Sequence, residues 1–221
     1  MTQSYRVHDR ASAILEYWFQ SLDDEARLEP ASEPFKTCYA RWYGKDLSID
    51  AEIRHLFEGD LQTVTAAGGE WISIIDAWAA VPGGLLALTI LLDQFPRNMY
   101  RGTVGMYEYD PLALVVATRA VSEAGGGTRS LVRQLFQNVP FMHIENLTIQ
   151  QFMLGQFRSL AALAETRSPH NVQFFRFALR YAERHADVIQ KYGRFPHRNS
   201  ILGRTATPAE VEYMQGEDPG F

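Results

Sequence analysis

The chain has 221 residues, of which 46% are hydrophobic and 21% charged, and its formal net charge is −5. This composition is typical of a globular protein, and the negative charge argues against a general binder of nucleic acid or of anionic membranes. Residues 1–10 are polar and the longest apolar stretch, residues 85–92, is short. We therefore expect neither a secretory signal nor a membrane span, and a cytoplasmic protein.

Apolar residues in the first half of the chain recur with helical rather than alternating spacing. This pattern predicts helices over residues 9–19, 33–43 and 71–80. Between them, Ser48 or Asp50 is expected to cap a helix that runs through Phe57 and either ends there or resumes across Gly59 to Ala67. The next segment, residues 85–94, is apolar on all sides except near its end. It is therefore predicted to be a central helix that is buried on every face.

The second half has the same helical character. Asp110 and Pro111 open a predicted helix that ends before Gly125-Gly126-Gly127, a triplet without the Gly-Lys-Ser/Thr ending of a phosphate loop. Further helices are predicted over residues 131–136, 147–163 and 171–192, and a last one follows the capping box of Thr207 and Glu210. We predict a single all-α domain, residues 1–221, of about nine or ten helices stacked as antiparallel hairpins.

Two segments about a hundred residues apart share a motif of Phe-Pro, then Arg-Asn, then Gly, Arg and Thr. They are the first Phe-Pro motif, residues 93–103, and the second Phe-Pro motif, residues 193–205. Because proline disfavours a continuing helix, each motif is predicted at a helix exit. The side chains presented there are candidate ligand-binding groups: Arg97, Asn98, Arg101, Arg194, His197, Arg198, Asn199 and Arg204. Guanidinium groups match carboxylate and phosphate, so the expected ligand is a small anionic molecule or a peptide.

Asp93 is the most informative candidate for acid–base chemistry. It is expected at the C-terminal end of the apolar helix, where the helix dipole disfavours a negative charge. Arg97 and Arg101 are the expected compensating groups. Two interpretations are open: a buried ion pair that fixes the turn, or a functional carboxylate whose pKa is shifted by its surroundings.

Three further residues complete the candidate catalytic set. His185 falls at the border of the apolar face of helix 171–192 and is either a hydrogen-bonding or a catalytic residue. His143 and Glu145 lie one residue apart, just before the helix at 147. They could bind a metal with His185 or His197, although the spacing matches no specific metal signature. Glu145 could instead cap the helix, and we assign no metal or cofactor from the sequence.

Nucleophilic catalysis is not indicated. The single cysteine, Cys38, stands among aromatic residues and is predicted to be a buried, inert thiol. A Gly-x-Ser-x-Gly elbow is absent from the sequence. Any chemistry is therefore expected to be acid–base or metal-assisted.

Several of these motifs resemble one bacterial family, the domain of unknown function nine-two-four. The likeness rests on residues 85–103, 140–145 and 185–204 and on Leu15-Glu16-Tyr17-Trp18-Phe19, and it extends over almost the whole chain. The resemblance implies a fold similar to tetratricopeptide-like helical domains, although the chain shows no clean repeat of about 34 residues. Ile144 stands where the family pattern has Ser. Membership implies no particular function.

Three interpretations follow for the Phe-Pro motifs. In the first, both motifs converge in a cleft with the four candidate catalytic residues, and the protein is an enzyme acting on a small phosphate- or carboxylate-bearing substrate by acid–base chemistry. In the second, the helical stack binds a peptide or partner protein and the arginines clamp an acidic group. In the third, the motifs are structural corners. The sequence does not indicate an oligomeric state.

Overall fold

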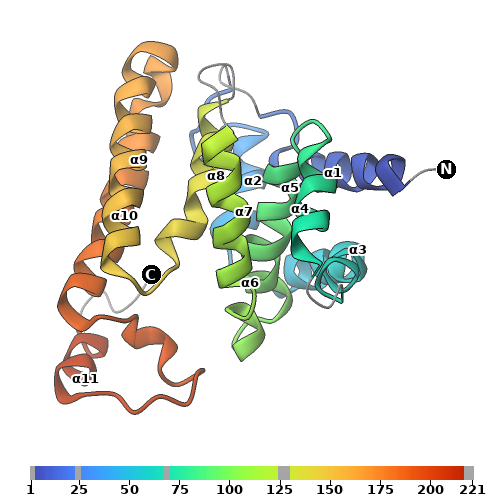
Figure 1. Cartoon of the computed structure of the whole chain (residues 1–221). Coiled ribbons are helices and arrows are strands. Elements are labelled where there is room, and N and C mark those ends of the chain that lie inside the picture. The colour runs from blue at the N-terminus through green and yellow to red at the C-terminus, as the bar shows by residue number, and fades with distance from the viewer. Residues whose placement is uncertain (1–2, 23–25, 67–69, 124–129, 217–221) are drawn as a thin grey trace.

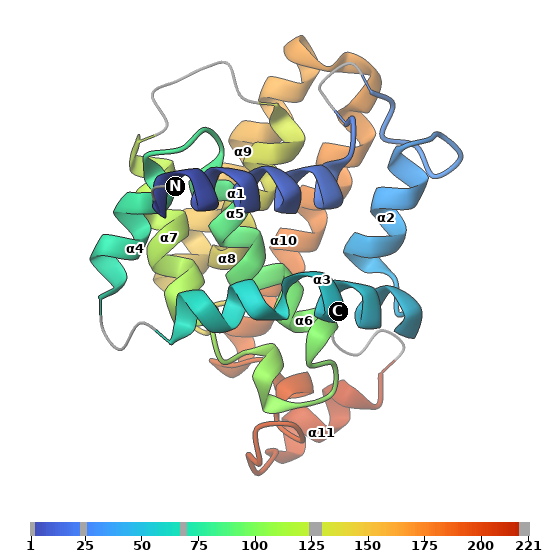
Figure 2. The ribbon, with the colours of Figure 1, turned by 90° about the vertical axis from the view of Figure 1, so that its right-hand side faces the viewer.

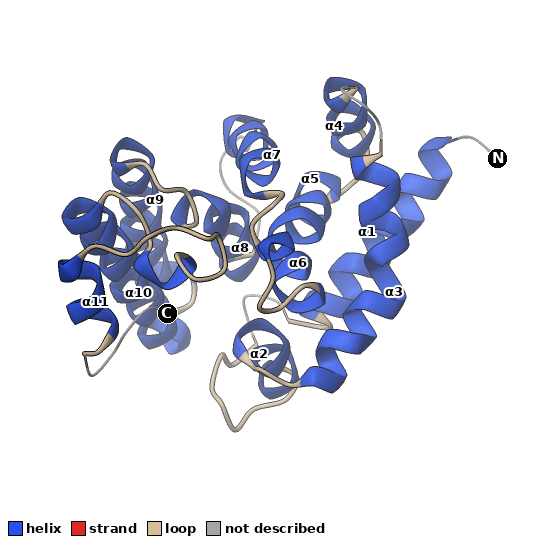
Figure 3. Cartoon of the chain, turned by 90° about the horizontal axis from the view of Figure 1, so that it is seen from below, coloured by secondary structure: helices blue, strands red, loops and turns tan. Residues whose placement is uncertain are grey.

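The computed structural model describes residues 3–22, 26–66, 70–123 and 130–216, and all regular secondary structure in these ranges is helical (Figure 1, Figure 3). The prediction of an all-α fold is confirmed. The α-helices are α1 Gln3–Phe19, α2 Phe35–Tyr43, α3 Leu47–Thr65, α4 Trp71–Ala79, α5 Gly84–Thr89, α6 Phe95–Met99, α7 Asp110–Glu123, α8 Leu131–Met142, α9 Leu147–Arg167, α10 Val172–Tyr192 and α11 Pro208–Met214. A π-helical turn, η1 Ile90–Gln94, and three 3₁₀ turns, η2 Val104–Met106, η3 Pro169–Asn171 and η4 Pro196–Arg198, complete the list. The predicted glycine turn, Gly125-Gly126-Gly127, lies outside the described residues.

Successive helices pack against one another through the second half of the chain. Helices α7, α8, α9 and α10 each contact the next, and the long pair α9 and α10 flanks one side of the molecule (Figure 1). Helices α1 and α3 lie on the other side, with α2 beyond the end of α1 (Figure 2). These neighbouring pairs agree with the predicted hairpins, whereas the likeness to tetratricopeptide repeats stays a prediction.

Helix α5 is the centre of the core. It contacts α1, α4, α7 and α8, and every residue from Gly84 to Gln94 is buried. The prediction of a central helix buried on every face is confirmed. Because such a helix has no solvent-facing side, any polar residue on it must find its partners within the protein. Asp93 is one such residue.

Pro96 does not end the helix at the first Phe-Pro motif, so the predicted exit at the proline was wrong, and the exit lies later in the motif. The helix continues through Pro96 and ends only at Met99, before Gly102 adopts a positive φ of 78°. The π-helical turn Ile90–Gln94 explains this, because the Phe95 N–H donates to the Ile90 carbonyl and a new helix begins there. Pro96 then lies in a first turn, where its missing N–H is tolerated. Asp93 is consequently inside a continuous helical run and not at its C-terminal end.

The second Phe-Pro motif does lie at a helix exit, as predicted. Helix α10 ends at Tyr192, and Gly193 adopts a left-handed conformation with φ 70°. Glycine is favoured at this position because it carries no Cβ. The chain then forms η4, and the predicted capping box of Thr207 and Glu210 opens α11.

Helix α8 is longer than predicted. It extends past Phe136 to Met142 with Pro140 inside it, so His143 follows directly at its C-terminal end. Cys38 is fully buried, as expected, and burial raises the pKa of its thiol to about 11. No helix in the described part of the chain has both the length and the apolarity to cross a membrane.

Candidate active site

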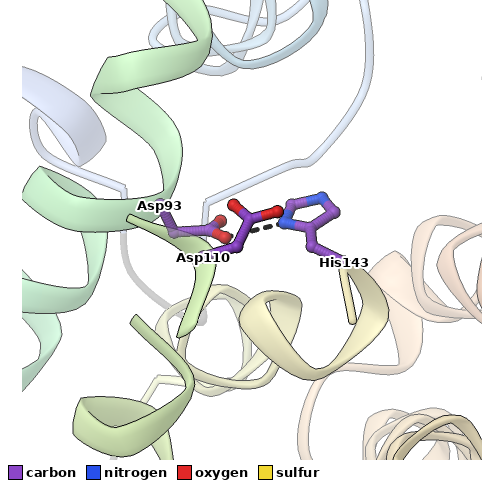
Figure 4. Close-up of side chains that lie close together, drawn as sticks. All are labelled: Asp93, Asp110 and His143. Carbon is purple, nitrogen blue, oxygen red and sulfur yellow. Dashed lines mark hydrogen bonds and ion pairs between the residues drawn. The ribbon is translucent and has the colours of Figure 1, made fainter. Parts of the chain in front are cut away.

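The centre of the site is a hydrogen bond between a buried carboxylate and a histidine. Nδ1 of His143 lies 2.7 Å from Oδ1 of Asp93, whose side chain is 0% exposed (Figure 4). Gln94 Nε2 donates to the other carboxylate oxygen at 2.5 Å. Arg97 donates to the Asp93 carbonyl at 2.5 Å and approaches Oδ1 at 3.6 Å. The carboxylate is thus held from three directions and fixes the orientation of the imidazole.

The surroundings of this pair determine its ionisation. Burial alone would raise the pKa of Asp93, but Arg97 and His143 outweigh burial and hold it below its usual range. Burial, followed by Arg97, lowers the pKa of His143 despite the opposing effect of Asp93. At neutral pH we therefore expect an ionised Asp93 and a neutral His143 that donates from Nδ1.

This tautomer leaves Nε2 of His143 with a lone pair. In Figure 4 this nitrogen is on the side of the ring turned away from Asp93. None of the described residues forms a hydrogen bond with it, and 14% of the His143 side chain is exposed. The pair is consequently suited to accepting a proton from a bound molecule.

Asp110 joins the two Phe-Pro motifs. Arg97 of the first motif donates to Oδ1 at 2.8 Å, and Arg198 of the second donates to Oδ2 at 3.1 Å. The Arg198 guanidinium also lies 4.4 Å from the ring centroid of Tyr107 and 4.7 Å from that of Phe195. From the sequence, Asp110 was expected only to start a helix, and Tyr107 was not expected in the site. Both residues are far from Arg198 in the chain, so the sequence around Arg198 does not indicate either contact.

Two further histidines lie in this region: His185 of α10 is near His143, and His197 of the second motif is near Phe195. His185 is buried, deeper than the predicted border position, and its Nδ1 lies 2.9 Å from the Tyr181 carbonyl. Its ring centroid is 6.4 Å from that of His143 and 5.6 Å from that of Phe195. Burial lowers the pKa of His185 well below its usual value, and burial and then Arg198 lower the pKa of His197 to about 4.

Glu145 clamps the second motif in place. Its carboxylate accepts two hydrogen bonds from Arg204, at 2.7 and 3.0 Å, and one from the Phe195 N–H at 2.8 Å. Arg204 also donates to the Asn199 side chain and to the Phe195 carbonyl. Asn146, not Glu145, caps α9, so the capping role considered for Glu145 was wrong.

The remaining predicted ligand-binding residues belong to two separate groups. Asn98 and Arg101 bind Asp50 of α3, with Arg101 nitrogens at 2.6 and 2.8 Å from its oxygens. Arg194 binds Glu210 of α11 at 2.6 and 2.7 Å. The two groups attach the motifs to neighbouring helices and do not contact the histidines through any described bond.

A metal is not favoured at the carboxylates. One ligand atom each of Asp93, Asp110 and His143 lies within 4.8 Å of the others, a set that differs from the predicted His143 and Glu145 (Figure 4). Two guanidinium groups, however, already neutralise these two carboxylates. A divalent cation would have to bind beside two fixed positive charges, so we assign none.

A groove of about 630 Å³ lies elsewhere, between α1, α3 and α4. Its lining includes the ion pair of Arg10 and Asp60 together with apolar residues such as Trp78, and none of the candidate residues. The candidate site is therefore identified by its hydrogen-bonded side chains, which lie outside this groove.

Comparison with known proteins identifies the family. Residues 14–218 match the family described as bacterial protein of unknown function (DUF924). The chain belongs to this family. One similar solved structure is that of the protein of unknown function ATU0120 from Agrobacterium tumefaciens. It is 31% identical to this chain, with a TM-score of 0.71, and the match covers 93% of this chain and 96% of the other. Among curated proteins, none matches.

The Arg101 contact in this DUF924 member predicts a purely structural effect. Arg101→Ala should lower the free energy of unfolding by about 1–3 kcal/mol, because Asp50, only 10% exposed, loses its charged partner. Urea unfolding measures the loss. The NMR signals of the His143 ring should stay in place, and a change in them would show that the two groups are coupled.

The lowered histidine pKa values predict a loss of stability in acid. Burial lowers the pKa values of His143, His185 and His197 in the folded chain, so these side chains take up protons less readily there than in the unfolded chain. The unfolded chain takes up these protons near pH 6.5, so stability is full above that pH and falls below it. With a folded pKa of about 4, His197 alone should cost roughly 2 kcal/mol at pH 5.

Urea unfolding at pH 7.5 and pH 5.0 tests this loss. Asp93 does not contribute to it, because its stabilisation is lost only as the pH falls below about 4. His197→Gln should reduce the difference between the two pH values. An unchanged difference would contradict the role given to His197.

Proposed function

We propose that this protein is an enzyme in which His143 accepts a proton from a small substrate that carries a phosphate or carboxylate group. The observation that carries the proposal is the 2.7 Å hydrogen bond from His143 Nδ1 to the fully buried Asp93. A carboxylate in this position fixes the imidazole tautomer and stabilises the imidazolium that forms when Nε2 takes a proton. The π-helical turn that carries Asp93 supports this reading, because such turns are frequent at functional sites.

The substrate class follows from the neighbouring cations. Arg97 and Arg204 use their guanidinium groups extensively within the protein. Arg198 differs, because its bond to Asp110 comes from Nη1 and no described residue accepts from its Nε. Arg198 is therefore the arginine best placed to share its charge with an anion next to His143.

The test is a panel of phosphorylated and carboxylated small molecules, screened by thermal shift and then for turnover. A substrate should stabilise both the unmodified protein and His143→Gln, while turnover should fall about 10²–10⁴-fold in His143→Gln. His55→Gln, at an exposed histidine of α3, is the matched control and should keep full turnover. Equal turnover by His143→Gln would exclude His143 as the base.

The alternative is a binding module for a peptide or partner protein. One observation favours it: the arginines of both Phe-Pro motifs named above each form an ion pair with a carboxylate of this chain. The motifs would then be corners, or clamps for an acidic group. In that case a peptide ending in glutamates should bind, should lose affinity in Arg198→Ala, and should bind His143→Gln unchanged.

A further inference from the structure

Helices α2 and α10 carry aromatic side chains at helical spacing. On α2 they are Phe35, Tyr39 and Tyr43, and on α10 they are Phe174, Phe177 and Tyr181. Residues four or seven positions apart lie on one side of a helix. Tyr39 and Tyr43 contact each other with ring centroids 4.8 Å apart, and Phe177 and Tyr181 stack at 6.5 Å. Each helix therefore has an aromatic face.

The two aromatic faces are turned toward each other. Phe35 and Phe174 meet at one end, with ring centroids 5.5 Å apart. Tyr43 and Tyr181 each lie about two helical turns further along these two faces.

Much of this aromatic surface is nevertheless open to solvent. Tyr39 is 39% exposed, Tyr43 43% and Phe177 49%. The Tyr43 ring is thus within reach of a small molecule. Exposed tyrosine rings provide flat, rigid contact surfaces at low entropic cost.

From this surface a row of neighbouring rings continues inward to the candidate active site. The ring of Tyr181 lies 4.8 Å from that of His185, and His185 lies 6.4 Å from His143. A series of neighbouring rings thus connects the exposed tyrosines to the proton-accepting histidine. A molecule bound against Tyr43 and Tyr181 would extend toward the His143 ring.

We propose that Tyr39, Tyr43, Phe177 and Tyr181 bind a flat aromatic or conjugated part of the substrate whose reacting end lies at His143. This rests on the proposed function and specifies its substrate class as a planar molecule with an anionic group. A partner protein fits less well, because four side chains supply far less than the roughly 1,200 Å² of a stable interface. Continuity with the histidines also favours a small substrate.

The experiment measures binding of 1-naphthoate and of cyclohexanecarboxylate, an anion without an aromatic ring, by titration calorimetry and NMR. Naphthoate should bind more tightly and should shift the ring signals of His185 and His143. Tyr43→Leu should weaken naphthoate binding roughly fivefold, because it keeps bulk and removes the flat ring. Tyr43→Phe, which keeps the ring, should bind normally, and Ile72→Ala, at an exposed apolar residue of α4, is the control.

Equal naphthoate binding by Tyr43→Leu and the unmodified protein would overturn the inference, as would histidine signals that do not move. A dimer that Tyr43→Leu dissociates would also overturn it, since the rings would then be an interface between copies. None of these results depends on proton transfer by His143, which the turnover of His143→Gln tests separately. Failure of the aromatic site and failure of the proposed function are therefore distinguishable.

Discussion

Replacement of Asp110 by alanine is expected to lower the free energy of unfolding by about 3–5 kcal/mol. The carboxylate accepts from Arg97 and from Arg198, and the Arg198 side chain is only 8% exposed. Removing it leaves two largely buried cations without their shared anion. Few single substitutions have effects of this size, and a buried unpaired charge is one of their recognised causes.

Urea unfolding at pH 7 measures this effect, and two further variants serve as comparisons. Asp110→Asn keeps the size and one acceptor oxygen and should lie between alanine and the unmodified protein. Asp187→Ala, at an exposed position of α10, should change stability by no more than about 0.5 kcal/mol. A loss below about 1 kcal/mol in Asp110→Ala would show that the two Phe-Pro motifs are not held together by Asp110.

Asp93→Asn is the second substitution with a large expected effect. The carboxylate is completely buried between Arg97 and His143, so loss of its charge should cost about 3–5 kcal/mol in urea unfolding. Because Asp93 raises the pKa of His143 against the effects of burial and Arg97, its neutralisation should lower that pKa further. A histidine with a lower pKa is a weaker base, and turnover should fall with it.

Nitrogen NMR of the His143 ring measures both its pKa and its tautomer. In the unmodified protein the proton should be on Nδ1, and in Asp93→Asn this preference should weaken because the charged acceptor is gone. Asp46→Asn, at the exposed cap of α3, is the control and should leave the ring signals unchanged. An unaltered tautomer in Asp93→Asn would show that Asp93 does not orient the His143 ring.

Local sequence signals located most helices and several of their ends. The spacing of apolar residues predicted the buried helix at α5, and the capping box predicted the start of α11 at Thr207. Such signals depend on residues within about one helical turn of each other, so they are readable without knowledge of the fold. The exit of α10 at Gly193 was predicted for the same reason.

The same local reasoning failed at Pro96. Proline usually ends a helix, but a π-helical turn in front of it lets the helix resume and carries Asp93 into the helical interior. Burial of the whole segment against four other helices favours continued helix over an exit loop. This stabilisation comes from tertiary packing, which a single local motif does not encode.

By itself, then, the sequence determined the all-helical class, the central apolar helix and the residue types of the site. Only the tertiary structure decided which of these residues meet. His143 is hydrogen-bonded to Asp93, which is 50 residues away in the chain, and Arg198 to Asp110, which is 88 residues away. The same packing leaves Arg101 and Arg194 in separate ion pairs. The physical reason is that an ion pair needs only proximity and low solvent access, and both depend on how distant helices pack and not on the neighbouring sequence.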